Sequence, residues 1–369
     1  MLVTIVAGAR PNFVKIGPIL KALNQHPRKK NLTYRLVHTG QHYDKKMSGD
    51  FFEQLGLPEP HVNLMAGGGS QAEQTGAIMI NFEKYLISNP TDFVLVVGDV
   101  NSTMACAITA KKLCIPVVHV EAGIRSGDMT MPEEVNRVVT DSICDHFFTT
   151  TEGAGTHLLS TGISKERIHF VGNTMIDTLY QNLDKAKQPA IWADKNLTRG
   201  NYYVTTLHRP SNVDDKDNLK RILDVIIGNC ELPIVFPVHP RTKKVIEAIP
   251  YEHPRLFMVE PMAYLEFIYL VQNSRAVITD SGGITEETTV MRVPCLTLRN
   301  STERPETVTI GSNELVGDDP TNLIPFLHKL DEGTWKKSEI PALWDGKTAT
   351  RIVDKLVNLY GRLEPSLVD

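Results

Sequence analysis

The chain has 369 residues, more than one ordinary hydrophobic core encloses, and its hydrophobic (41%) and charged (22%) fractions are those of a globular protein. The net charge of -4, with no compensating basic block, argues against a nucleic-acid binder. We expect neither a signal peptide nor a membrane span, because no apolar run is long enough. The five cysteines form no CxxC pair, so buried thiols in a reducing cytoplasm are expected rather than disulfides or a zinc site.

The first apolar run, residues 2–6, predicts a strand that leads through a loop into a helix with apolar residues at helical spacing. The loop lacks the GxGxxG pattern of a nicotinamide site. It offers Arg10 and Lys15 instead, two cations at a junction where helix amides already favour an anion such as a phosphate.

A second strand is predicted at residues 36–38, then helices at 50–56 and 71–88, with a flexible glycine-rich loop at 67–70. Residues 93–97 form the clearest strand, which ends near Asp99; an alanine-rich helix at 102–113 leads to a strand that ends at Glu121. Because such a unit is right-handed with parallel strands, Asp99 and Glu121 should emerge at one edge of one sheet. The alternative is that Asp99 only caps the helix that starts near Asn101.

The loop after Glu121 leads to Pro132, a residue favoured at the first position of a helix. Within that helix Glu133 and Arg137 are four residues apart and share a face, with the acid in the first turn. This stretch gathers two carboxylates and an arginine. The alternative is a surface ion pair beside an acidic loop.

Further strands are predicted at residues 147–148, 168–171, 202–206, 234–238, 256–259, 276–279 and 295–298, with an irregular polar connection at 185–200. The alternation predicts an α/β protein with two Rossmann-like doubly wound domains facing a central cleft. We place the domains at residues 1–173 and 174–346. A C-terminal helix, with apolar residues at helical spacing over 348–363, belongs to a last segment, 347–369, that could pack back on the first domain.

Two motifs of the second half stand at strand ends. His208 follows one strand with a neighbouring arginine. In the other, a strand runs through Ser281, Gly282 and Gly283 into a helix, which aims bare amides and a hydroxyl at a diphosphate. The alternative is a tight turn that simply requires glycine. Glu287, one turn into the helix, is placed to accept hydrogen bonds from sugar hydroxyls, and the loop at 299–307 offers arginine to a phosphate.

These motifs occur in an order that resembles the non-hydrolysing UDP-N-acetylglucosamine 2-epimerases, over nearly the whole chain from Leu2 to about Gly317. The matching stretches are GARPNFVK (8–15), HTGQH (38–42), GDVNST (98–103), HVEAGIRS (119–126), MPEEVNR (131–137), GNTMID (172–177), TLHRP (206–210), DSGGITEE (280–287) and TERPETV (302–308).

The resemblance implies a GT-B arrangement, a homodimer, and interconversion of UDP-N-acetylglucosamine and UDP-N-acetylmannosamine without a metal or redox cofactor. UDP would be eliminated to leave a 2-acetamidoglucal and then added back. Carried onto matching positions, the catalytic group is Asp99, Glu121, Glu133, Arg137 and His208. The UDP-sugar group is Arg10, Lys15, His42, Phe267, Ser281, Gly282, Gly283, Glu287 and Arg304.

Three positions depart from the bacterial pattern. Many bacterial members carry an Arg-Gln pair where this chain has Gly68-Gly69, and an arginine where it has Pro210. In those members the positions help to hold an activating second substrate molecule, so we expect no such activation here. Alternatives to the main prediction are a 2-epimerase for a related UDP-2,3-diacetamido uronic acid, a hydrolysing epimerase, a GT-B glycosyltransferase and a catalytically silent nucleotide-sugar sensor.

Overall fold

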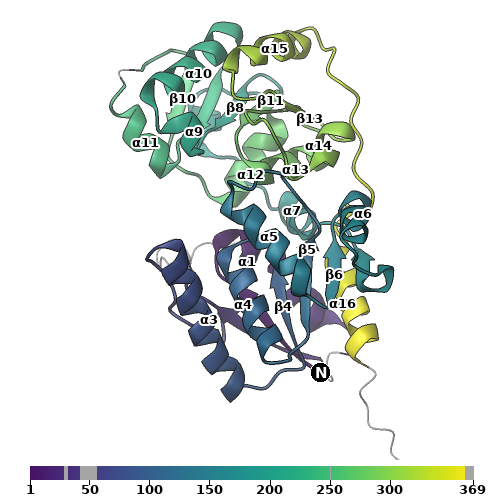
Figure 1. Cartoon of the computed structure of the whole chain (residues 1–369). Coiled ribbons are helices and arrows are strands. Elements are labelled where there is room, and N and C mark those ends of the chain that lie inside the picture. Colours follow the sequence, from purple (N-terminus) through teal and green to yellow (C-terminus); the bar gives the residue numbers. More distant parts are fainter. Residues whose placement is uncertain (29–31, 42–55, 250, 362–369) are drawn as a thin grey trace, which may run out of the picture. The chain divides into compact units, whose positions relative to one another are not determined.

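The computed structural model describes residues 1–28, 32–41, 56–249 and 251–361. Contacts divide the chain into two compact units, Met1–Gln181 with Ala342–Asp369, and Asn182–Pro341. Each unit is a parallel sheet between helices (Figure 1). The prediction of an α/β protein with two Rossmann-like doubly wound parts is therefore confirmed. No helix in the described ranges is long and apolar enough to cross a membrane.

The first unit has a seven-stranded sheet in the order β3-β2-β1-β4-β5-β6-β7, and the strand order reverses between β1 and β4. Its strands are β1 (Leu2–Ala7), β2 (Thr33–His38), β3 (Val62–Asn63), β4 (Phe93–Val97), β5 (Val117–Ala122), β6 (His146–Thr149) and β7 (Ile168–Phe170). Its helices are α1 (Arg10–Gln25), α3 (Gln71–Ser88), α4 (Asn101–Lys112), α5 (Pro132–Ile143), α6 (Glu152–Ser160), the short η2 (Lys165–Arg167), α7 (Thr174–Leu183), which runs into the second unit, and α16 (Thr348–Tyr360).

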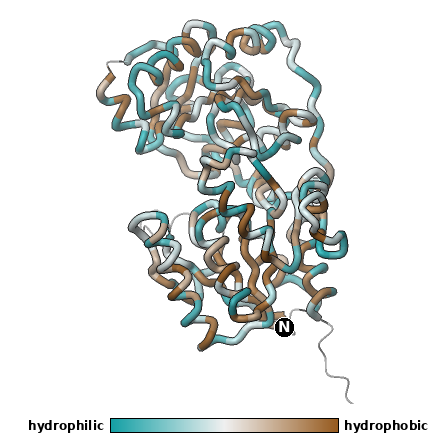
Figure 2. Tube along the Cα trace, in the orientation of Figure 1, coloured by the Kyte–Doolittle hydropathy of each residue, from teal (hydrophilic) through white to brown (hydrophobic). Residues whose placement is uncertain are grey.

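Successive side chains of the buried strands point to opposite faces of this sheet, so that each face carries a hydrophobic core. In β4, Phe93, Leu95 and Val97 point into the cluster covered by α1 and α16, whereas Val94 and Val96 point into the cluster covered by α3 and α4. Figure 2 shows the resulting apolar strands inside the unit. Each fully buried side chain of this size contributes about 1.5–3 kcal/mol to folding.

The second unit repeats the plan with six strands in the order β10-β9-β8-β11-β12-β13, reversing between β8 and β11. Its strands are β8 (Tyr203–Thr206), β9 (Ile234–Pro237), β10 (Leu256–Val259), β11 (Ala276–Thr279), β12 (Cys295–Thr297) and β13 (Asn313–Leu315). Its helices are α8 (Ala190–Asp194), α9 (Pro210–Val213), α10 (Lys216–Asn229), α11 (Pro240–Ile246), α12 (Tyr264–Asn273), α13 (Gly282–Met291), α14 (Pro305–Thr309), the short η3 (Pro320–Leu323) and α15 (Ile324–Asp331).

Three details differ from the expectations, and a fourth prediction is not tested. The edge strands β3 and β13 were not predicted, because two or three residues at a sheet edge carry too little pattern. The short α8 lies in the connection expected to be irregular. Cys114, expected to be buried, is exposed, because it follows the end of α4 in the left-handed conformation (φ 58°). The helix predicted at 50–56 falls almost wholly outside the described residues.

Candidate active site

The carboxyl ends of β4 and β5 carry the first pair of candidate acids. These strands are hydrogen-bonded neighbours, so Asp99 and Glu121 emerge at one edge of the sheet, as predicted. α4 begins after Val100, whose side chain makes no cap bond, so Asp99 does not act as the residue that caps this helix. Asp99 is therefore available for another role.

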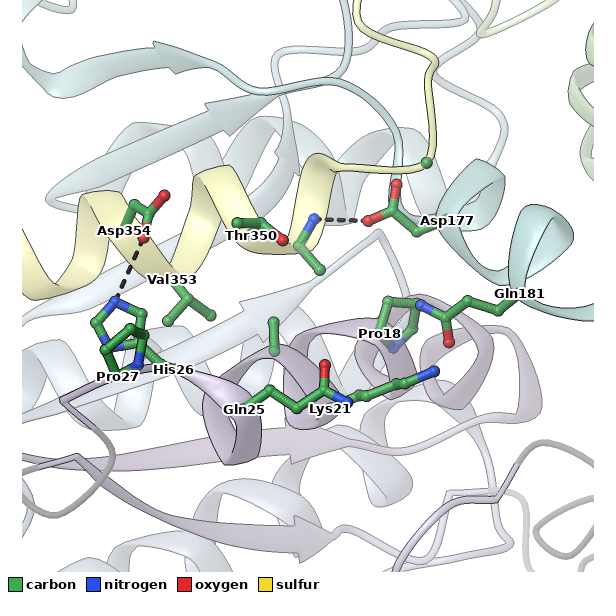
Figure 3. A pocket seen from close by; sticks show the side chains of 13 residues that line it. Pro18, Lys21, Gln25, His26, Pro27, Asp177, Gln181, Thr350, Val353 and Asp354 are labelled. Atoms are coloured by element: carbon green, nitrogen blue, oxygen red, sulfur yellow. Dashed lines mark hydrogen bonds and ion pairs between the residues drawn. The ribbon is translucent and has the colours of Figure 1, made fainter.

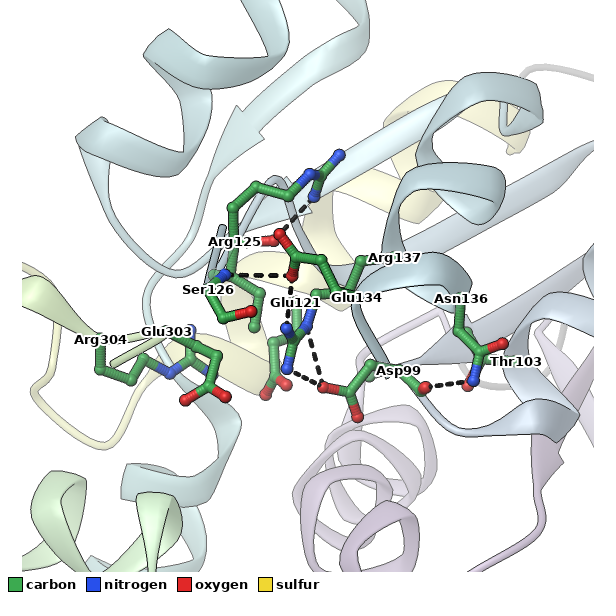
Figure 4. A network of polar contacts seen from close by, with 12 residues as sticks. Asp99, Thr103, Glu121, Arg125, Ser126, Glu134, Asn136, Arg137, Glu303 and Arg304 are labelled. Carbon is green, nitrogen blue, oxygen red and sulfur yellow. Dashed lines mark hydrogen bonds and ion pairs between the residues drawn. The ribbon is translucent and has the colours of Figure 1, made fainter. Parts of the chain in front are cut away.

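Arg137 of α5 holds Asp99 in place. Its Nε and Nη2 donate to Asp99 Oδ2 at 3.0 and 2.6 Å, a pairing drawn in Figure 4. Arg137 is only 4% exposed, so the alternative of a surface ion pair does not describe this contact. The neighbouring Asn136 donates to the backbone carbonyl of Asp99 at 2.8 Å. Two consecutive residues of α5 thus fix both the side chain and the backbone of Asp99.

Glu121 is buried and faces a cation from another element. Its Oε1 lies 2.5 Å from Lys15 Nζ of α1. The Glu121 backbone has φ 72°, which an L-residue adopts at a cost of about 1–2 kcal/mol, and the β5–β6 register shifts at the same point. Strain of this kind at a charged residue is typical of functional sites. Arg10 lies at the first position of α1 and is exposed.

The acid that Arg137 contacts on its own helix is Glu134, which the sequence analysis did not single out. Glu134 Oε2 accepts from Arg137 Nη1 at 2.6 Å, and its two oxygens accept from the backbone N–H groups of Ser126 and Gly127 at 3.0 Å (Figure 4). Burial alone would raise the pKa of Glu134, but these bonds outweigh it and lower that pKa. Glu133 is exposed on the same helix. Glu134 and Glu133 are three and four residues before Arg137, and both spacings place an acid on the same side of the helix. Only the burial of Glu134 distinguishes the two acids.

In the second unit, His208 follows β8 and is held by a buried acid. Its Nδ1 lies 2.8 Å from Asp280 Oδ1, and Asp280 also accepts from the backbone N–H groups of His208 and Arg209 and from Asn212 Nδ2. Burial would raise the pKa of Asp280, but His208 and these donors lower it. The carboxylate therefore accepts a hydrogen bond from Nδ1–H and leaves Nε2 of the half-exposed ring for a ligand.

The Ser-Gly-Gly segment joins β11 to α13, as predicted. Ser281 is the N-cap residue of α13 but its side chain makes no cap bond. Neither Gly282 nor Gly283 has a positive φ, and a Cβ on Gly283 would meet nothing within 4 Å. Backbone conformation and packing therefore do not require glycine at 283, contrary to the tight-turn alternative. What glycine provides there is unobstructed access to the amides at the start of the helix.

Three further candidates lie on α13 or on elements that contact it. Glu287 is buried, and its Oε1 accepts from the Tyr264 hydroxyl at 2.7 Å. Burial raises the pKa of Glu287 to about 7, with the nearby Glu286 adding to the rise. Arg304 is buried and donates from Nε to Glu286 Oε1 at 2.6 Å. Phe267 of α12 is half-buried against the core of this unit.

One predicted site residue cannot be located, and a metal site and a cavity were also sought among the described residues. His42 lies outside the described residues. Within the described ranges, no three His, Cys, Asp or Glu side chains gather in a group that could hold a metal ion. A cavity of about 320 Å³ lies among α1, α7 and α16, where Asp177 and Lys21 are among its lining (Figure 3). None of the candidate site residues lines it.

Comparison with known proteins gives consistent matches over nearly the whole chain. The family model described as UDP-N-acetylglucosamine 2-epimerase matches residues 22–357. The UDP-N-acetylglucosamine 2-epimerase of Methanocaldococcus jannaschii is 41% identical over 375 residues, covering 98% of this chain and 100% of the relative. The UDP-2,3-diacetamido-2,3-dideoxy-D-glucuronate 2-epimerase of Pseudomonas aeruginosa is 39% identical over 321 residues, covering 86% and 88%. The crystal structure of the M. jannaschii enzyme with UDP-GlcNAc and UDP superposes with a TM-score of 0.84 at 42% identity, covering 97% and 100%.

Proposed function

Because the chain belongs to the UDP-N-acetylglucosamine 2-epimerase family, we propose that it interconverts UDP-N-acetylglucosamine and UDP-N-acetylmannosamine. The observation that carries this proposal is the pair of carboxylates at adjacent strand ends, Asp99 and Glu121, each held by a cation. Paired carboxylates of this kind can act as general base and general acid in proton transfer.

The chemistry explains the need for acids. The hydrogen on carbon 2 of the sugar is not next to a carbonyl, so its removal alone would leave an unstabilised carbanion. If the C1–O bond to UDP breaks as the C2–H bond breaks, the electron pair forms a C1=C2 double bond, and 2-acetamidoglucal and UDP result. Re-addition of UDP to carbon 1, with a proton delivered to the opposite face of carbon 2, gives the epimer.

We assign the proton transfers to Asp99, Glu121 and Glu133. Each such group can contribute about a hundredfold to ten-thousandfold to the rate. Arg137 orients Asp99 by its two bonds. Lys15 fixes the carboxylate of Glu121 and adds a positive charge at the same sheet edge.

We assign UDP binding and departure mainly to the second unit. The α13 amides at Gly282 and Gly283, the Ser281 hydroxyl and the His208 ring would stabilise the negative charge that develops on the leaving diphosphate. Arg304 would add positive charge, and Glu287 would accept hydrogen bonds from the ribose hydroxyls. Phe267, Arg10 and His42 complete the proposed UDP-sugar contacts.

The second candidate function is 2-epimerisation of a UDP-2,3-diacetamido uronic acid. It is favoured by the 39% identity to the P. aeruginosa enzyme that bears this name, close to the identity of the M. jannaschii relative. The two activities share the chemistry at carbon 2 and differ in the substituents at carbons 3 and 5.

Product analysis with both nucleotide sugars tests the proposal. We expect UDP-GlcNAc to give UDP-ManNAc, with a much slower reaction on the diacetamido uronate. The reverse order would favour the second candidate. Release of free N-acetylmannosamine with UDP would indicate a hydrolysing epimerase, and turnover only with an added acceptor would indicate a glycosyltransferase.

A homodimer in the cytoplasm completes the proposal. Ile80 and Ile87 on α3 are 55% and 67% exposed and are available as apolar contacts between copies. Four of the five cysteines are buried free thiols, which suits a reducing compartment. Sedimentation analysis at micromolar concentration should give twice the mass of the chain; a monomer at all concentrations would contradict this part.

A further inference from the structure

Two fully or almost fully buried groups, His119 and Asp141, lie beside the proposed acids without contacting them. His119 is on β5, two residues before Glu121, and is 0% exposed. Asp141 is on α5, four residues after Arg137, and is 3% exposed. Their contacts, all within the first unit, connect the backbone segments that carry Asp99 and Glu121.

His119 joins two elements through its ring. Nδ1 lies 2.7 Å from Asp141 Oδ1, and Nε2 lies 2.9 Å from the carbonyl oxygen of Gly98. Gly98 immediately precedes Asp99, so the ring ties the end of β4 to β5 and α5. The carbonyl of Gly98 can only accept, so Nε2 of His119 is a donor.

Asp141 secures the chain on the other side of Glu121. Its Oδ2 accepts from the backbone N–H of Gly123 at 3.0 Å and from Arg125 Nη1 at 2.7 Å. Burial would raise the pKa of Asp141, but His119 and Arg125 outweigh it and lower that pKa. The carboxylate is thus ionised and fully used in holding its neighbours.

Glu121 lies between these anchored points in the left-handed conformation, with φ 72°. A non-glycine residue keeps such a conformation only where the surrounding structure enforces it. His119, two residues before, and Gly123, two residues after, are both fixed by Asp141. Without this restraint the backbone would relax toward an ordinary extended form, and the Glu121 carboxylate would leave its position at Lys15.

We propose that His119 and Asp141 are positioning residues, which hold Glu121 in its strained conformation and the end of β4 in register so that both acids are placed for proton transfer. This role rests on the proposed epimerase function. It acts through geometry, since neither side chain contacts the reacting carboxylates. A displacement of about 1 Å of a catalytic group can lower a rate about 100-fold.

The test compares Asp141→Asn with Asp141→Ala in the full chain. Asparagine can keep every bond: its oxygen accepts from Gly123 and Arg125, its amide donates to Nδ1 of a neutral His119, and Nε2–H still donates to Gly98. We therefore expect kcat within about threefold of wild type for Asp141→Asn and about 100-fold lower for Asp141→Ala. KM should change by less than about threefold in both, because the side chain lies outside the proposed UDP contacts.

Rates are expressed per UDP-binding site counted by calorimetry, so that loss of folded protein does not count as loss of kcat. If Asp141→Ala does not fold, His119→Gln replaces it: glutamine keeps a donor for Gly98 but loses Asp141, and the same fall in kcat is expected. His169→Gln is the matched control, a buried histidine on β7 of the same sheet, and should leave kcat unchanged.

Two results would overturn the positioning role. One is an unchanged kcat in folded Asp141→Ala or His119→Gln. The other is an Asp141→Asn variant as slow as Asp141→Ala, which would assign the effect to charge rather than geometry. The wild-type rate on UDP-GlcNAc tests the proposed function, whereas the ratios between variants test the positioning role, so the two can fail separately.

Discussion

At the scale of single residues, three of the candidate side chains are held in place by partners from other elements. Asp99 is bound by Arg137 of α5, Glu121 by Lys15 of α1, and His208 by Asp280. A buried charge without such a partner would be costly, so these pairs can hold charged groups at otherwise apolar strand ends. The pairing orients these side chains before any substrate arrives.

Glu287 is the exception, because its nearest hydrogen-bond donor is the neutral Tyr264. Its pKa is raised to about 7 by burial, against 4.5 as the ordinary value. A raised acid pKa stabilises the folded state at low pH, and this stability is lost as pH rises from 4.5 through 7.

We therefore predict that Glu287→Gln is nearly neutral for stability at pH 5 and stabilising at pH 8, by up to about 3 kcal/mol. Glutamine can still accept from Tyr264 but carries no charge to desolvate. Denaturant unfolding at the two pH values measures the difference, with Glu332→Gln on the surface as control. An equal effect at both pH values would show that ionisation of the buried Glu287 carboxyl does not destabilise the folded protein.

The residues that sequence reasoning found and those it missed differ in a physical way. Asp99 and Glu121 were predictable because strand ends in a parallel sheet converge. Glu134 was missed because Glu133 and Glu134 both lie within one turn of Arg137, and only the packing of the helix buries one of them. Asp280 stood inside a recognised motif, but its contact with His208 joins residues 72 apart, which no local pattern reveals.

At the scale of elements, the N-terminus of α13 was predictable in full, since a strand, Ser-Gly-Gly and a helical pattern follow directly in the sequence. Edge strands β3 and β13 were not, because they are formed by pairing with a neighbour rather than by their own residues. Because the structure of α13 does not require glycine at 283, a substitution there can test a binding role of Gly283 without disturbing the fold.

We predict that Gly283→Ala keeps or raises stability, by up to about 1 kcal/mol, since alanine favours a helix and its Cβ meets nothing. UDP affinity should fall at least about tenfold, because the methyl group would occupy the approach to the helix amides. Thermal unfolding and calorimetry with UDP provide the two readouts. Gly228→Ala in α10, where a Cβ also meets nothing, is the matched control and should bind UDP normally. Normal UDP affinity in Gly283→Ala would contradict the proposal that the amides at the start of α13 bind the diphosphate.

At the scale of the whole molecule, the chain leaves the first unit and returns to it at residue 342. The returning helix α16 packs Ile352, Val353 and Leu356 into the core beside α1. Its first turn is held by Asp177 of α7, which accepts from the backbone N–H groups of Thr348 and Ala349 at 3.0 and 2.6 Å. Figure 3 shows Asp177 beside the start of α16. The amphipathic pattern predicted the helix, but not this distant cap.

Removal of the Asp177 carboxylate should weaken the packing of α16 against the first unit. Asp177→Ala leaves two helix amides without their acceptor, and we expect a loss of about 1–2 kcal/mol in the free energy of unfolding. Asp354→Ala, which removes only the contact of the exposed Asp354 of α16 with His26, should cost less than about 1 kcal/mol. Chemical denaturation measures both. Equal losses in the two variants would contradict the role of Asp177 in docking the helix.

The proposed function depends most on proton transfer at carbon 2 by the strand-end acids, and hydrogen exchange tests this directly. The protein is incubated with UDP-N-acetylglucosamine in deuterated water, and deuterium at carbon 2 is followed by NMR. We predict deuterium at carbon 2 as epimerisation proceeds, and a fall of at least about 100-fold in this rate for Asp99→Asn and Glu121→Gln, with UDP binding retained. Bound nucleotide sugar without exchange, or exchange unaffected by both substitutions, would contradict the account.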